Sequence, residues 1–470
     1  MRPTDASHEA TSQTYPSLAP VPGGPAKPAD PVCPGARSDP GPGIPAWALE
    51  PEAQDRDPRP MPTPPFVLDA HVDALLRSVD LGHDLGLEGP GHLDLVRGRR
   101  GGLGAVVLTA WCEPRFVAPG DPGAAAPAPP WSAPADLTTG SADVAPDPAP
   151  LPGTGGAFER TRRLVEAGRA LCARHPDLAR LVEAPGDLAA ARAAGATGVV
   201  LGIEGGHAIE SSLSKLEAFH ALGVRLMTLV WNNHLPWVRS CRPVPEDLGF
   251  EPPTGLSDFG REVVERMDAL GMVVDLSHAG DEAFDHTLAL GGAPRMASHS
   301  GCRALHDHPR NLTDEQLRRL ADAGGCLGVV FHGAFLDPAA QAEDAAVYAS
   351  EAYRAIGREP GTELHESGAA RWQAKCAHHQ AVAAPFSLDR VADHVLHAVD
   401  VAGSDAVGLG SDFDGIPRTP DDLRSAADYP RLAERLAERG LTARQVDGVM
   451  GENLARLFDA VFARGTVASA

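Results

Sequence analysis

The sequence has few of the features that mark secreted, disulfide-rich or nucleic-acid-binding proteins. Seven of its 470 residues are cysteine, and none forms a C-x-x-C pair, so neither a disulfide framework nor a thiolate zinc site is indicated. Basic residues are outnumbered, with 41 Lys and Arg against 63 Asp and Glu. The resulting formal charge of −22 would be repelled by polyanions, which argues against nucleic acid or an anionic membrane as the main partner.

Long hydrophobic runs are also missing from the sequence. No run approaches the length of a transmembrane span, and the N-terminus "MRPTDASHEATSQTYPSLAP" has no apolar core of signal-peptide length. The C-terminus "ARGTVASA" lacks the apolar tail of a lipid-anchor signal. We therefore expect no membrane insertion and a cytoplasmic location, where a reducing environment suits the cysteine usage.

Two stretches of the sequence lack the periodic hydrophobic residues that a folded element would bury in a core. Residues 1–62 are Pro-rich and aperiodic, which predicts a disordered arm. Residues 118–156 are rich in Pro and Ala and predict a loop inserted between folded elements. The hydrophobic content of 43% suffices for a large core, and we expect a single catalytic domain over residues 63–465.

Eight short apolar runs recur through that domain, and most are separated by helical patterns. Their nearly continuous hydrophobicity is typical of parallel strands covered on both faces. This rhythm predicts an α/β fold, a (β/α)8 TIM-type barrel; a doubly wound open sheet is the alternative, but no G-x-G-x-x-G follows the first strand. The runs are "FVLDAH" at 66, "GLGAVVLTAW" at 102, "TGVVLGIEGG" at 197, "VRLMTLVW" at 224, "GMVVDLSH" at 271, "PRMASHS" at 294, "CLGVVFH" at 326 and "AVGLGSDFDG" at 406.

Polar residues that can bind metals end several of these runs. His71 and Asp73 are two residues apart, so a strand would point both to one face. Any one of these residues alone could be a polar strand end or a helix cap, but together they form a mixed nitrogen and oxygen ligand set that suits one or two zinc ions or a similar divalent metal. The set comprises His71, Asp73, Glu204, His278, His299 and Asp412.

Several long motifs, in order, resemble the membrane dipeptidase (renal dipeptidase) family of zinc peptidases, within the metal-dependent hydrolase superfamily. The resemblance covers most of residues 66–460, apart from 118–156 and a second expected insert at 335–383. Its carriers are "DAHVD" at 69, "GGLGAVVLTAW" at 101, "GIEGGHAIESSLSKLEAFHALGVRLMTL" at 202, "GLSDFGREVVERMDALGMVVDLSH" at 255, "ASHSGCRALHDHPRNLTDEQL" at 297, "VGLGSDFDGIPRTP" at 407 and "GENLARLF" at 451.

The resemblance implies a dipeptidase that cleaves small peptides with a free C-terminal carboxylate through a water bridging two zinc ions. It places His71 and Asp73 on one Zn²⁺ and His278 and His299 on the other, with Glu204 bridging the pair. Asp412 would face the water and move its proton, so Glu204 and Asp412 are the expected catalytic residues. Arg310 would pair with the substrate's terminal carboxylate. Family members are often dimers, so a homodimer is expected.

Two positions depart from the family pattern. Trp231 stands where the animal members carry a histidine that helps to hold the substrate, and Trp111 stands where the family has an active-site tyrosine. His234, three residues beyond Trp231, is a candidate replacement or else an ordinary loop residue. Both tryptophans are expected to line the substrate pocket and to make it more aromatic.

Two further functions remain open from the sequence. The metal site could act on another amide, an ester or a cysteinyl-glycine type of conjugate, or the barrel could bind metal without turnover. Other polar residues are expected to be structural: His207 supports the site, and Asp414 forms a turn with Gly415. Solvent-facing positions are expected for four more histidines, His306, His308, His378 and His379.

Overall fold

The short apolar runs of the sequence form parallel β-strands. In the computed structural model, which describes residues 65–114, 156–246, 248–356 and 369–467, each of the eight predicted runs contains one strand. The strands are β1 (Val67–Val72), β2 (Leu103–Trp111), β4 (Thr197–Glu204), β5 (Val224–Thr228), β6 (Val273–Asp275), β7 (Met296–Ser300), β8 (Cys326–Val329) and β9 (Val407–Leu409).

These strands close into a barrel. The order β2-β1-β9-β8-β7-β6-β5-β4 is completed by a pairing of β2 with β4, which runs without a break from Ala105 opposite Gly198 to Trp111 opposite Glu204. A short ninth strand, β3 (Ala179–Leu181), adds to β4 outside this ring. The predicted TIM-type barrel is confirmed, and its closure places Trp111 beside Glu204.

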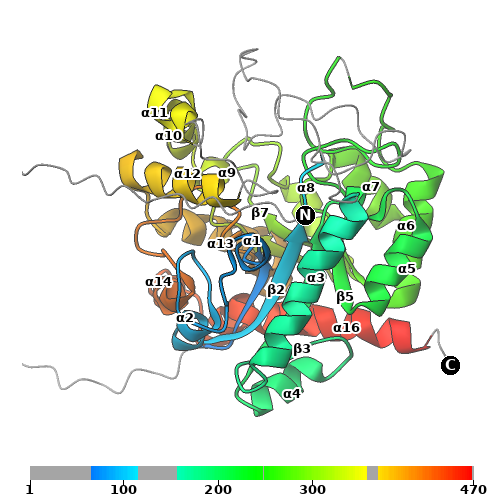
Figure 1. Ribbon diagram of the computed structural model, residues 1–470, viewed down its shortest axis with the longest axis horizontal. Helices are drawn as coiled ribbons and strands as arrows, with labels where there is room; N and C mark the ends of the chain where they lie inside the picture. Colours follow the sequence, from blue (N-terminus) through cyan, green and yellow to red (C-terminus); the bar gives the residue numbers. More distant parts are fainter. Residues whose placement is uncertain (1–64, 115–155, 247, 357–368, 468–470) are drawn as a thin grey trace, which may run out of the picture. The chain divides into compact units, whose positions relative to one another are not determined.

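Helices follow most strands and surround the barrel (Figure 1). Local signals set their ends: Thr313 and Gln316 form a capping box at the start of α8, and Gly271 ends α6 in the left-handed conformation. The helices are α1 (Leu75–Leu81), α2 (Leu95–Arg100), α3 (Ala157–Arg174), α4 (Asp187–Ala193), α5 (Leu213–Ala221), α6 (Asp258–Leu270), α7 (Asp281–Ala289), α8 (Asp314–Asp322), α9 (Gly333–Leu336), α10 (Pro338–Ala349), α11 (Glu351–Ala355), α12 (Ala369–Val382), α13 (Asp389–Ala402), α14 (Tyr429–Glu438), α15 (Ala443–Asp447) and α16 (Asn453–Val467).

Two groups of buried residues form the core. The larger group packs the outer faces of the strands against the helices, as expected when helices cover a parallel sheet. The smaller group combines alternate strand residues, such as Ala105 and Val107, with Leu454 and Phe458 of α16. In Figure 1, α16 runs across the end of the barrel away from α10 and α12. The opposite end, where the strands finish, is left for polar side chains.

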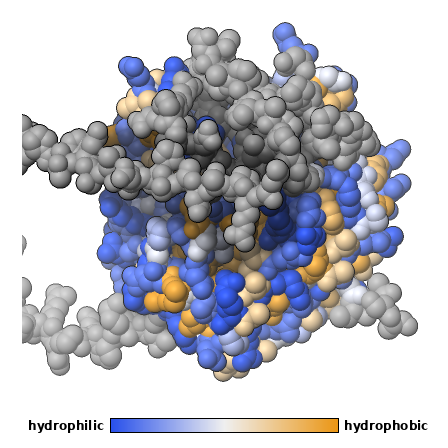
Figure 2. All heavy atoms as spheres, in the orientation of Figure 1, coloured by the Kyte–Doolittle hydropathy of each residue, from blue (hydrophilic) through white to orange (hydrophobic). Residues whose placement is uncertain are grey.

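The predicted arm at residues 1–62 lies outside the described residues, and so does almost all of the predicted loop at 118–156. The described part of the 335–383 insert is helical, comprising α10, α11, α12 and the end of α9. None of the described helices is both long and apolar enough to cross a membrane. Hydrophilic residues dominate the visible described surface in Figure 2, with hydrophobic ones scattered among them.

Candidate metal centre

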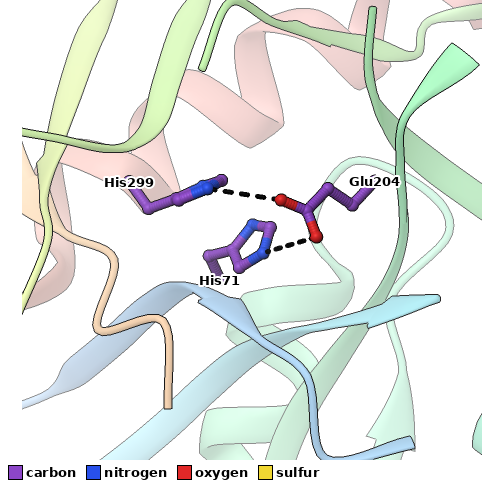
Figure 3. A group of neighbouring side chains, drawn as sticks. All are labelled: His71, Glu204 and His299. Atoms are coloured by element: carbon purple, nitrogen blue, oxygen red, sulfur yellow. Dashed lines mark ion pairs between the residues drawn. The ribbon is translucent and has the colours of Figure 1, made fainter. Parts of the chain in front are cut away.

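The carboxyl ends of the barrel strands bring the predicted ligands together. His71 comes from β1, Glu204 ends β4 and His299 belongs to β7; Figure 3 shows their side chains converging from three sides. Possible ligand atoms of these three residues lie within 4.8 Å of one another, and the same holds for His71, Asp73 and Asp412. The two groups share His71, so the strand ends build one continuous cluster.

The two carboxylate oxygens of Glu204 lie near different imidazole rings. Its Oε1 lies 2.9 Å from Nε2 of His278 and 3.4 Å from Nε2 of His299. Its Oε2 lies 3.7 Å from Nε2 of His71, which is itself 3.6 Å from Oδ2 of Asp73. A carboxylate placed in this way can serve two neighbouring cations, one through each oxygen.

Hydrogen bonds at Nδ1 determine which nitrogen each imidazole presents. Ser298 donates its hydroxyl to Oδ2 of Asp275 at 2.6 Å, so its oxygen accepts Nδ1–H of His299 at 2.7 Å. In the same way Oδ1 of Asn232 accepts Nδ1–H of His278 at 3.0 Å. Both rings therefore turn an Nε2 lone pair toward the cluster, the arrangement usual for histidine ligands of metals.

The cluster has the properties of a cation site. Nε2 of His71 and Oδ1 of Asp73 are buried, and neither has a hydrogen-bond partner within the described part of the chain. Nε2 of His278 and Nε2 of His299 face each other at 3.0 Å, although two lone pairs repel unless a proton or a cation lies between them. The nitrogen and oxygen donor set suits zinc.

Burial and mutual charge shift the pKa values of the cluster in opposite directions. Burial, reinforced by Arg310, lowers the pKa of His278 to about 4, so this imidazole is neutral and able to coordinate. Burial disfavours the cation of His71, but Glu204 and Asp73 raise its pKa well above the usual value. Burial opposes the charge of Glu204, but the neighbouring charge of His71 holds its pKa well below the ordinary range.

Asp412 is the carboxyl group of the cluster that most readily holds a proton. Burial and the neighbouring carboxylates Asp73 and Glu204 raise its pKa well above the ordinary value, against the opposing charge of His71. Its backbone has a φ of 60° and that of His278 a φ of 67°, conformations that cost non-glycine residues on the order of 1 kcal/mol each. At Gly415, an added Cβ would lie 2.2 Å from Asp73 Oδ2 and 2.3 Å from Asp412 Oδ1, so only glycine fits beside this carboxylate pair.

Arg310 is a buried cation that faces the same cavity. Its two terminal nitrogens donate to Ser300 Oγ at 3.3 Å and to the His299 carbonyl at 3.0 Å. Its guanidinium lies over the Phe335 ring at 5.1 Å. Within the described residues no carboxylate forms an ion pair with Arg310, and its Nε has no partner. A buried guanidinium without a counter-ion is suited to receive the carboxylate of a ligand.

The cavity has a volume of about 760 Å³, and four residues of the cluster line it together with Trp111, Trp231 and Arg310; the four are Asp73, Glu204, His278 and Asp412. His234 is not among the described lining residues. Its Nδ1 accepts the backbone N–H of Ser240 at 3.3 Å, and its Nε2 donates to the Pro243 carbonyl at 3.1 Å. His234 thus holds a loop, and the structure gives no contact through which it could replace the family histidine.

Several other histidines differ from the sequence prediction. His306, His308 and His379 are buried rather than solvent-facing, whereas His378 is half-buried. His308 stacks on Phe335 with ring centroids 4.6 Å apart. Sequence patterns missed them because they lie in loops or on a helix whose burial depends on packing between distant segments.

The polar residues that orient the imidazoles of the cluster were harder to recognise from the sequence. Ser298 and Asp275 lie inside predicted strands, and a buried polar residue within such a run requires a partner. Asn232 follows Trp231 without any such pattern. His207 is structural, as predicted, since its Nε2 donates to the Cys112 carbonyl at 2.8 Å. Asp414 pairs with buried Arg77 at 2.7 Å and has a left-handed φ of 68°.

Comparison with known sequences points to one family. A profile of the membrane dipeptidase family (peptidase family M19) matches residues 60–468. An uncharacterised dipeptidase of Schizosaccharomyces pombe is 34% identical over 63% of this chain and 60% of its own length. Dipeptidase 3 of Mus musculus is 31% identical over 62% of this chain and 49% of its own length. The chain thus matches about half to three fifths of these relatives.

Solved structures with the same barrel agree in fold. A probable dipeptidase from Pseudomonas aeruginosa has a TM-score of 0.65 at 23% identity, covering 85% of this chain and 96% of the other. A metallopeptidase from Rhodobacter sphaeroides, solved with a phosphinate mimic of the dipeptide L-Ala-D-Ala, has a TM-score of 0.61 at 22% identity, covering 85% of this chain and 99% of its own. At these identities the likeness concerns the fold.

Proposed function

Because the chain belongs to the membrane dipeptidase family, peptidase family M19, we propose that it is a metal-dependent dipeptidase holding two zinc ions. The observation that carries the proposal is the pairing, in one cavity, of a nitrogen and oxygen ligand cluster with the buried, unpaired guanidinium of Arg310. The cluster suits hydrolysis of an amide, and the guanidinium suits a substrate that ends in a free carboxylate.

Each residue of the cluster has a task in this proposal. His71, Asp73, Glu204, His278 and His299 would hold the zinc, which would supply Lewis acidity to polarise the scissile carbonyl and to lower the pKa of an attacking water. Asp412, whose raised pKa favours a bound proton, accepts the proton of that water on a carboxylate oxygen and passes it to the leaving amine. Arg310 orients the substrate by its carboxylate.

The proposal predicts that Arg310→Met raises KM for dipeptides by about tenfold to a hundredfold, the usual loss for a charged hydrogen-bonded pair. Because Arg310 binds a part of the substrate that does not react, kcat should change less than KM. Steady-state kinetics on a dipeptide series measures both constants. Arg319→Met is the matched control, because Arg319 pairs with Asp285 on the surface of α8. Unchanged kinetics in the Arg310 variant would remove this residue from substrate binding.

The direct test combines elemental analysis with hydrolysis of L,L and L,D dipeptides before and after chelation. We expect about two zinc ions per chain and turnover that chelation abolishes and zinc restores. Zinc binding without cleavage of any dipeptide would move the substrate to another amide, ester or conjugate. A protein that binds no divalent metal would contradict the proposal.

Two further expectations stay proposals. A cytoplasmic location is supported by the six free cysteines within the described residues, and cell fractionation tests it. A homodimer is expected from the family, and sedimentation of the purified chain tests it.

A further inference from the structure

The geometry points to a binding site for an aromatic side chain on the N-terminal residue of the substrate, formed by Trp111 and Trp231. We refer to these two residues as the tryptophan pair. The inference rests on the proposed dipeptidase function and names a substrate class for it: dipeptides, or dipeptide-like amides, whose N-terminal residue is aromatic.

The tryptophan pair forms one continuous aromatic wall of the cavity. The two indole rings meet edge to face, with centroids 5.1 Å apart and planes inclined by 63°. Trp231 lies 6.3 Å from the His278 ring, so this wall begins directly beside the metal ligands. Both side chains are only partly buried and line the cavity. Their open faces are therefore available to a ligand.

The backbone beneath the pair permits this close arrangement. Gly205, which directly follows Glu204, has a φ of +98°, and a Cβ there would lie 3.2 Å from Cβ of Trp231. A larger residue would be strained and would crowd Trp231 away from the end of β4. Trp111 is held beside Glu204 by the register between β2 and β4.

The order of strands decides which end of the substrate meets the pair. Around the closed ring of eight strands, β2 stands opposite β7. Trp111 ends β2, whereas Arg310 is hydrogen-bonded to His299 and Ser300 of β7. A dipeptide held by its carboxylate at Arg310, with its peptide bond over the central ligand cluster, extends its N-terminal residue across the mouth toward Trp111.

The volume of the cavity and the chemistry of the indole rings both suit a ligand with an aromatic side chain. A cavity of about 760 Å³ is in the range that accommodates drug-sized ligands, and a dipeptide of two small residues would leave much of it to water. Aromatic rings bind well to edge-to-face indole pairs, because ring faces and edges carry opposite partial charge.

The test compares kcat/KM for Phe-Ala, Ala-Phe and Ala-Ala, each in L,L and L,D form, on the zinc-loaded protein. We expect Phe-Ala to exceed Ala-Ala by about tenfold or more, the scale on which an apolar subsite discriminates. Ala-Phe should show no such advantage. Replacing both tryptophans by Ala should bring the ratio of kcat/KM for Phe-Ala to kcat/KM for Ala-Ala close to one. Equal rates for Phe-Ala and Ala-Ala in the unaltered protein would overturn the inference, and so would a preference that survives the double substitution.

Controls separate the subsite from folding and from the proposed function. Trp372→Phe alters a tryptophan that lines the cavity from α12 and donates to the Asp414 carbonyl; it should leave the Phe-Ala to Ala-Ala ratio unchanged. If the double variant unfolds, Trp111→Tyr and Trp231→His replace it. If no dipeptide is cleaved, the dipeptidase function fails, and calorimetric Kd values for Phe-Ala and Ala-Ala decide the subsite: tighter Phe-Ala binding that is lost with the tryptophans supports it, and equal Kd values refute it.

Discussion

At the scale of single residues, the cluster depends on side chains that coordinate nothing themselves. Ser298 gives its hydrogen to Asp275 and accepts Nδ1–H of His299, and the Ser298 oxygen also lies 3.3 Å from Nδ1 of His71. One hydroxyl thus sets the tautomer of His299 and supports the ring of His71. Asp275 is in turn held by backbone N–H groups of Ser277 and Ser298 at 3.0 and 2.8 Å.

Ser298→Ala should therefore weaken zinc binding although it removes no ligand. We expect a loss of about tenfold to a hundredfold in metal affinity, as is usual when a partner of a ligating histidine is deleted. Competition with a chromophoric chelator measures this affinity. Ser214→Ala, at an exposed position of α5, is the control and should bind zinc as the unaltered protein does. Equal affinity in the Ser298 variant would mean that packing alone orients both imidazoles.

At the scale of elements, buried polar contacts attach α10, α12 and α13 to the barrel mouth. His394 of α13 accepts the N–H of Cys302 at 2.9 Å and donates to the Leu336 carbonyl at 3.0 Å, which requires a neutral ring. On another side, Asp344 of α10 accepts from His379 of α12 at 2.9 Å and from Arg418 at 2.7 Å. These contacts place the helices that follow β8 beside the cavity.

His394 should make the protein acid-sensitive. Burial lowers its pKa to about 4, below the usual 6.5, so the unfolded state binds more protons between these values and stability falls as the pH drops from about 6.5 to about 4. The shift corresponds to roughly 3 kcal/mol. In urea unfolding at several pH values, His394→Gln should be less stable at pH 7 but should lose less stability on acidification. A pH slope in the His394 variant that parallels the slope of the unaltered protein would contradict the assignment.

Arg418 should be important for stability because it is buried with its partner. Its Nε meets Asp344 at 2.7 Å, and both side chains are almost fully buried. Arg418→Met leaves a buried carboxylate with one partner fewer and should cost about 3–5 kcal/mol in the free energy of unfolding. Chemical denaturation measures this cost. Arg424→Met removes an exposed pair with Asp421 and should change little. A similarly small effect at Arg418 would show that solvent reaches the pair.

At the scale of the whole molecule, closing the barrel concentrates charge at its mouth. Asp73, Glu204 and Asp412 come from strands far apart in sequence, yet all three carboxyl groups lie in one buried cluster. The chain as a whole carries a formal charge of −22. A bound cation would neutralise part of this local charge, so metal binding and folding should be coupled.

Removing the metal should therefore destabilise the entire domain. We expect chelation to lower Tm by about 5 °C or more, from the linkage between binding and folding, and zinc to restore it. Magnesium prefers an octahedral shell of oxygen ligands and should not restore Tm, which makes it the control. Scanning calorimetry gives the result, and an unchanged Tm after complete removal of zinc would show that the strand ends are stable without a cation.

Local patterns in the sequence predict the barrel strands and the polar residues at their ends. Both depend on local patterns: continuous apolar runs mark buried parallel strands, and His71, Asp73, Glu204, His278, His299 and Asp412 end such runs. Two helix ends likewise depend on local sequence, at the capping box of Thr313 and at Gly271. Such features need only neighbours in the chain.

The way in which these strands and side chains meet could not be read from local patterns, because it depends on the folded barrel. Pairing of β2 with β4 placed Trp111 beside Glu204, hydrogen bonds to Ser298 and Asn232 set the imidazole tautomers, and His234 turned out to hold a loop. The burial of His306, His308 and His379 likewise depends on segments packed from elsewhere. Most of these outcomes follow from contacts between residues distant in the chain, and such contacts exist only once the barrel has closed and its core has packed.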